Sequence, residues 1–93
     1  MFNSPNDLVI TTRHVMELGW PILLVKHDLD EPPGWQFVNG HGDTDDPTSG
    51  IPVHVAHVIE RDPSVGELFD LPPGWRAWRE SEGQRWERER ELD

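Results

Sequence analysis

The sequence predicts an α+β fold, with a mainly antiparallel sheet of about 4–5 strands and 2–3 short helices. Short apolar or β-branched runs recur between turns rich in Pro, Gly and Asp, as in the strands of a small sheet. Two segments combine a helix-capping residue with helical apolar spacing. The 93 residues include five Trp and three Phe, enough bulk for one small core. We expect one α+β domain over residues 1–93, with an ordered core at about 7–88 and a charged tail at 89–93.

The first half of the chain predicts three strands and one helix. The segment DLVIT has the β-branched residues of a strand, and Thr12 after it can cap a helix that runs to about Leu18 and ends at Gly19. The dense apolar run PILLVKHD predicts a strand in the centre of the sheet. The segment WQFVNG follows a turn, so we expect it to pair with that strand as an antiparallel hairpin.

The second half contains a long loop, an ambiguous segment and a second hairpin. Residues 40–50, GHGDTDDPTSG, have the composition of a loop. The spacing in IPVHVAHVIE slightly favours a helix, but periodicity leaves residues 52–60 open between helix and strand. Asp62 is expected to cap a short helix that begins at Pro63. The segment WRAWRESEGQRWERE predicts two strands around a turn at residues 81–83.

The motif Pro-Pro-Gly-Trp occurs twice, at residues 32–35 and 72–75. Proline fixes φ and glycine permits a positive φ, so each copy suits a turn that leads into a strand beginning at Trp. The flanking residues do not match beyond the motif, and repeat architectures need about three units or more. We therefore interpret the two copies as the same turn chemistry used twice, rather than as an internal duplication or a Pro-rich ligand.

The net charge is −10, from 18 acidic and 8 basic residues. This sign disfavours binding to nucleic acid or to a membrane, since both depend on Lys and Arg. Seven acids and no Lys or Arg lie between His27 and Glu60, and such a tract attracts a basic protein partner. The absence of Cys excludes disulfides and cysteine-bound zinc.

The N-terminal segment lacks the basic and long apolar stretches of a secretory signal, and the longest apolar run, WPILLV, is far shorter than a membrane span. We therefore expect a cytoplasmic protein. An exposed strand edge makes a monomer or a weak homodimer the expected state.

No motif in the sequence indicates catalysis. The serines lie in turn or cap contexts, and the Gly-containing segment NGHGDTDDP is too acidic to bind phosphate. We expect a protein that is not an enzyme and that needs no cofactor. The cluster His41, Asp43, His54 and His57 suggests an alternative, a metal-binding domain or metal-dependent enzyme. Its spacing fits neither H-E-x-x-H nor an EF-hand, so we expect no metal site.

Recognition of another protein is the remaining class of function. Aromatic anchors surrounded by charge are typical of binding hot spots. The residues we expect to contact a basic partner are Trp35, Asp43, Asp45, Asp46 and Trp75. Trp75 and Trp78 have opposite parity on a strand, so one of the two is expected to face outward. An uncharacterised scaffold domain is a further alternative.

The order of these segments resembles the Immunity protein 33 family of bacterial polymorphic-toxin systems. The resemblance runs from about Thr12 to Trp86. It rests on Gly34-Trp35-Gln36-Phe37 followed by Gly40 and acids, on Asp62-Pro63-Ser64, and on residues 68–74. It implies a small cytoplasmic α+β protein that binds and neutralises a cognate toxin, and it carries over no catalytic residue.

Overall fold

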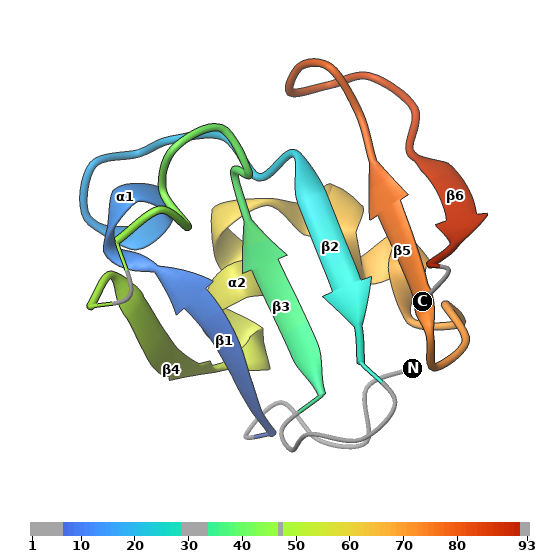
Figure 1. Cartoon of the computed structure of the whole chain (residues 1–93), viewed down its shortest axis with the longest axis horizontal. Helices are drawn as coiled ribbons and strands as arrows, with labels where there is room; N and C mark the ends of the chain where they lie inside the picture. Colours follow the sequence, from blue (N-terminus) through green and yellow to red (C-terminus); the bar gives the residue numbers. More distant parts are fainter. Residues whose placement is uncertain (1–6, 29–33, 47, 92–93) are drawn as a thin grey trace.

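Six strands form one sheet in the order β4-β1-β3-β2-β5-β6 (Figure 1). The computed structural model describes residues 7–28, 34–46 and 48–91. The strands are β1 (Leu8–Thr12), β2 (Leu24–His27), β3 (Trp35–Val38), β4 (Gly50–His54), β5 (Trp75–Trp78) and β6 (Glu87–Arg90). The helices are α1 (Arg13–Met16), α2 (Val55–Arg61) and the 3-10 helix η1 (Pro63–Leu68). This confirms the α+β prediction, with one strand more than expected.

Every neighbouring pair of strands is antiparallel except β1 and β3, which are parallel with Ile10 opposite Gln36. The segment PILLVKHD supplies β2, which lies near the centre of the sheet as predicted. It pairs with β3 as the expected hairpin, with Leu24 opposite Val38 and His27 opposite Trp35. The same register places Trp75 of β5 opposite His27 on the other side.

The ambiguous segment contains both a strand and a helix, and this accounts for the extra strand. Pairing with β1 holds the chain extended through His54, which lies opposite Leu8. The next amide, that of Val55, donates to Asp7 O at 2.8 Å, and α2 begins there. The proline at position 52 is tolerated because β4 is an edge strand.

Both predicted helix caps are present. Thr12 Oγ1 accepts a hydrogen bond from Val15 N at 3.3 Å, and α1 ends at Met16, earlier than the expected Leu18. Asp62 Oδ1 accepts from Ser64 N at 3.1 Å and Pro63 opens η1. In both cases a short polar side chain satisfies a backbone donor that the first turn leaves unpaired.

The two glycines of the repeated motif both have positive φ, 86° for Gly34 and 87° for Gly74. The tryptophan after each glycine begins a strand, β3 or β5. This confirms the predicted positive φ at both glycines and the strand start at both tryptophans. Residues 32 and 33 lie outside the described residues, so the first proline pair is not compared.

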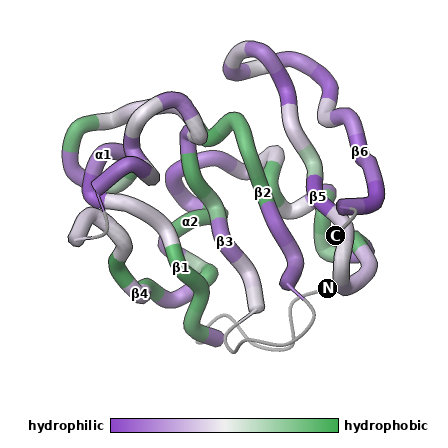
Figure 2. The backbone as a smooth tube through the Cα atoms, viewed as in Figure 1, coloured by the Kyte–Doolittle hydropathy of each residue, from purple (hydrophilic) through white to green (hydrophobic). Residues whose placement is uncertain are grey.

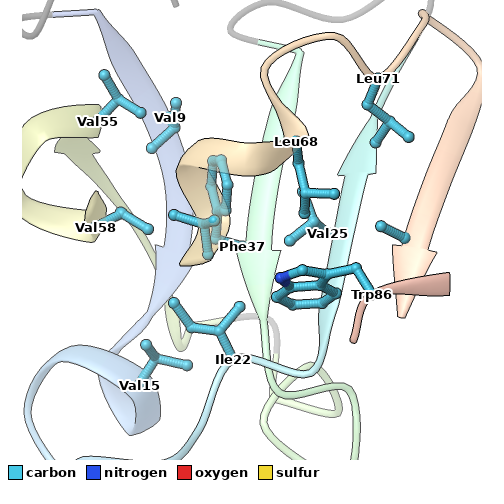
Figure 3. Close-up of a cluster of buried hydrophobic side chains, with 12 residues drawn as sticks. Val9, Val15, Ile22, Val25, Phe37, Val55, Val58, Leu68, Leu71 and Trp86 are labelled. Atoms are coloured by element: carbon cyan, nitrogen blue, oxygen red, sulfur yellow. The ribbon is translucent and has the colours of Figure 1, made fainter. Parts of the chain in front are cut away.

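The core lies between the sheet and the layer formed by α2 and η1, which cover one face of the sheet (Figures 1 and 3). Alternate strand residues point into it, among them Val25, Phe37 and Ala77, each 0% exposed. The helices contribute Val55, Val58, Val65 and Leu68. No helix of the described residues covers the other face of the sheet, and Figure 1 views the molecule from this open side.

Both edges of the sheet are poor templates for further pairing. The edge strand β4 contains Pro52, and the other edge strand, β6, has the sequence ERER with all four residues exposed. The tube of β6 is hydrophilic along its length (Figure 2). Proline and charge on edge strands hinder edge-to-edge association. Within the described ranges, no helix has the length and apolarity needed to cross a membrane.

Candidate functional site

The acidic loop, residues 40–49, joins the end of β3 to the start of β4 and is organised by one buried carboxylate. Asp43 is 0% exposed. Its Oδ2 accepts hydrogen bonds from Thr12 Oγ1 and Asn39 N, both at 2.8 Å, and its Oδ1 accepts from Gly40 N at 2.8 Å. All three donors are uncharged, and their hydrogen bonds satisfy both oxygens of this buried carboxylate.

Asp43 therefore differs from the sequence prediction, which placed it on the partner-binding surface. The carboxylate faces inward and ties the loop to the end of β1. The sequence carried a partial signal, because Asp in a Gly-rich turn often accepts hydrogen bonds from nearby backbone amides. It carried no signal for the bond from Thr12, which lies 31 residues away.

Asp45 and Asp46 are exposed on the same loop. Asp46 Oδ1 accepts from Thr48 N at 2.9 Å and from Thr48 Oγ1 at 2.8 Å. These hydrogen bonds lower the pKa of Asp46 below its ordinary value of 3.8, so the carboxylate is ionised at neutral pH. Ser49 Oγ donates to the carbonyl oxygens of both Asp43 and Asp46, at 2.5 and 2.8 Å. The two exposed carboxylates thus stand on a hydrogen-bonded loop.

The two tryptophans predicted as anchors lie elsewhere. Trp35 and Trp75 are half-buried and pack against the core from the helix-covered face of the sheet. They lie opposite His27 on either side of β2, and the Trp35 and His27 rings stack with centroids 4.0 Å apart. Each tryptophan begins its strand, whereas the acidic loop follows the end of β3. The structure therefore does not bring the five predicted contact residues together.

The outward-facing tryptophan is Trp78, at the end of β5, with 38% of its surface exposed. This agrees with the parity prediction that Trp75 and Trp78 face opposite sides. The sequence could not tell which one faces out, because that depends on which face the helices cover.

The connection between β5 and β6, residues 79–86, is held at both ends. The Arg79 guanidinium forms a buried ion pair with the Asp62 carboxylate, and its Nε donates to Ile22 O at 3.1 Å. It also lies over the Trp86 ring, 4.1 Å from the centroid. Ser64 Oγ accepts from Arg79 Nη1 at 3.0 Å and from Trp86 Nε1 at 3.3 Å. The motif Asp62-Pro63-Ser64 thus joins η1 to the β5–β6 hairpin.

Burial acts to raise the pKa of Asp62, but hydrogen bonds from Ser64 and Arg79, together with the Arg79 charge, outweigh it. The pKa of Asp62 is therefore held below the ordinary 3.8. Asp62 is therefore ionised at neutral pH, and its ion pair with Arg79 is buried rather than presented to a partner.

The histidines proposed as metal ligands do not converge. His54 and His57 stack with ring centroids 5.8 Å apart, and both are exposed, as is His41. Across residues 7–28, 34–46 and 48–91, no three His, Asp or Glu side chains are grouped closely enough to hold a metal ion.

The chain is thus a small α+β domain whose acidic loop exposes carboxylates at one end of the strands. The family model of the Imm33-like domain matches residues 1–88, and the chain belongs to this family. The family confirms the resemblance to the Immunity protein 33 family and suggests an immunity protein rather than an enzyme. No curated protein and no solved structure matches the chain.

Proposed function

We propose that this protein is an immunity protein that binds a cognate toxin with a basic surface and neutralises it in the cytoplasm. Membership of the Imm33-like family supports the class of function. The charge of −10 and the acidic tract between His27 and Glu60 support a basic partner.

The observation that carries the proposal is the exposure of Asp45 and Asp46 on a hydrogen-bonded loop. The ion pairs among the described residues use other carboxylates, namely those of Asp62, Asp70, Glu89 and Glu91. Asp45 and Asp46 are therefore available to attract a basic partner over a distance. Asp43 has no place in the proposed contact, because its carboxylate is buried.

The proposed mode of action is occlusion without catalysis. A toxin active site or substrate groove is blocked when the partner covers it, so the immunity protein contributes a complementary surface and no reacting group. We propose that it acts as a monomer or weak homodimer, since Pro52 and the charges of β6 hinder pairing at both sheet edges.

The test is to express the product of the neighbouring gene in a susceptible cell, with and without this protein. The expected result is growth arrest by that product alone, rescue on co-expression, and co-purification of the two chains in equal amounts. A second strain carrying the Asp43→Ala variant tests whether rescue needs the folded loop. Absence of both rescue and complex formation, with the wild-type protein folded, would overturn the proposal.

A further inference from the structure

Trp78 is an exposed aromatic side chain on the open face of the sheet that the family assignment does not explain. It lies opposite Leu24 of β2 on one side and opposite Glu87 of β6 on the other. At 38% exposure, more than a third of the surface of this large aromatic residue is left in water. Exposed tryptophans of this kind are frequent anchors of protein interfaces.

A hollow of about 320 Å³ lies beside Trp78, lined among others by Leu24, Gly40, His41 and Glu80. Gly40 has a φ of +85°, and a Cβ at this position would lie 3.4 Å from Leu24 Cδ2. The start of the acidic loop therefore lies close against Leu24, and forms one wall of the hollow. Trp78 and Glu80 also line the hollow.

The exposed carboxylate in the lining of this hollow is that of Glu80. Arg79 also contributes to its lining, but the Arg79 guanidinium is turned into the protein, with its side chain 1% exposed in the ion pair with Asp62. Glu80 is exposed and its carboxylate takes no part in the ion pairs of the described residues. An aromatic face next to a carboxylate is suited to a cation, and a guanidinium can both stack on the ring and bind the carboxylate.

The hollow and the acidic loop lie at the same end of the strands. Figure 1 shows that residues 40–49 and residues 79–86 both extend from the end at which β1, β3 and β5 finish. A basic protein attracted by Asp45 and Asp46 therefore approaches the end of the strands at which Trp78 lies.

We propose that the hollow between Trp78, Glu80 and Gly40 receives an arginine side chain of the partner. The inference rests on the proposed function only in taking a toxin as the source of that arginine. The arginine stacks on the Trp78 indole and forms an ion pair with Glu80, while the acidic loop supplies the long-range attraction.

The first arm of the test does not need the toxin. The ¹⁵N-labelled protein is titrated with a blocked Gly-Arg-Gly peptide, and the Trp78 Nε1–H resonance is assigned from the Trp78→Phe variant. We expect saturable shifts of Trp78 and Gly40 that are smaller with the lysine peptide and absent with the uncharged citrulline peptide. Equal shifts with citrulline, or shifts that leave Trp78 and Gly40 unmoved, would overturn the inference.

The second arm measures toxin affinity of Trp78→Ala and Glu80→Gln. Each is expected to weaken binding by about tenfold, as for a single interface anchor. Matched controls are Phe69→Ala, which removes another exposed aromatic (49% exposed), and Glu67→Gln on η1, and both should bind as the wild type does. Unchanged binding by Trp78→Ala and Glu80→Gln overturns the inference and leaves the proposed function standing. No binding by the wild type overturns the proposed function, and the peptide titration then still decides whether the hollow binds arginine.

Discussion

The acidic loop and the β5–β6 connection lie at the upper end of the strands in Figure 1. Each is held in place by a buried charged side chain, and the two charges have opposite sign. The acidic loop, residues 40–49, depends on the Asp43 carboxylate, which accepts hydrogen bonds from three uncharged donors. The β5–β6 connection, residues 79–86, depends on the Arg79 guanidinium, which pairs with a second buried charge, Asp62. In each loop one charged residue is used for structure, and its neighbours remain exposed.

The two loops differ in which groups lose their partners when the buried charged side chain is substituted. Loss of Asp43 leaves neutral donors unpaired, whereas loss of Arg79 leaves a buried carboxylate without its cation. An unpaired buried charge costs more than unpaired neutral groups. The comparison therefore predicts an order of effects on stability.

The largest effect is expected for Arg79→Met. Breaking a buried ion pair from one side typically costs about 3–5 kcal/mol, and here the substitution also removes the stacking on Trp86. Urea unfolding, compared with Arg85→Met at an exposed position, measures the change. A loss below that of the Asp43 variant would contradict the comparison.

A smaller loss is expected for Asp43→Asn, about 2–3 kcal/mol, because the amide keeps one acceptor but places an N–H₂ group against donors. The control is Asp45→Asn, two residues further along the same loop and exposed, which should change stability by less than about 0.5 kcal/mol. Equal unfolding midpoints for the two variants would show that Asp43 does not organise the loop.

Thr12→Val should cost about 1–2 kcal/mol, since it removes both the cap of α1 and one of the three hydrogen bonds to Asp43. The neighbouring Thr11 donates to Phe37 O instead, so Thr11→Val separates the effect on the acidic loop from the general loss of a buried hydroxyl. Hydrogen exchange at the Gly40 amide should increase in Thr12→Val and stay unchanged in Thr11→Val.

The smallest effect concerns pH. Because the pKa of Asp62 is lowered in the folded state, its contribution is fully present above the unfolded value, 3.8, and is lost as the pH falls through the lower folded value. Ser64→Ala removes a hydrogen bond to Asp62, so its acid unfolding should shift to higher pH. Ser81→Ala in the exposed turn is the control. Identical acid midpoints for Ser64→Ala and the wild type would rule out this linkage.

Local chemistry in the sequence was enough to predict the caps and the turns. Thr12, Asp62 and the two Gly-Trp strand entrances were all predicted from residues within a few positions of each other, and all are present. The conformations of these caps and turns depend on residues that are neighbours along the chain, and these can be read directly from the sequence.

Features set by distant parts of the chain could not be predicted in the same way. The strand over Gly50–His54 forms because β1 pairs with it along its whole length. Asp43 is buried because Thr12 meets it from another element, and Trp78 rather than Trp75 faces out because the helices cover the opposite face. The predicted site therefore contained the acidic loop but also included one buried carboxylate and two tryptophans from the far ends of their strands.

The most direct test of the central claim is the association rate with the proposed toxin partner, measured at several salt concentrations for the wild type and for Asp45→Asn/Asp46→Asn. The wild type should associate rapidly at low salt and slow down steeply as salt is added, whereas the double variant should associate more slowly with a flatter dependence. Glu67→Gln on η1, outside the acidic tract, serves as the control for loss of an exposed acid elsewhere. Identical rates for the wild type and the double variant at every salt concentration would contradict the claim that the acidic loop attracts the partner to this end of the sheet.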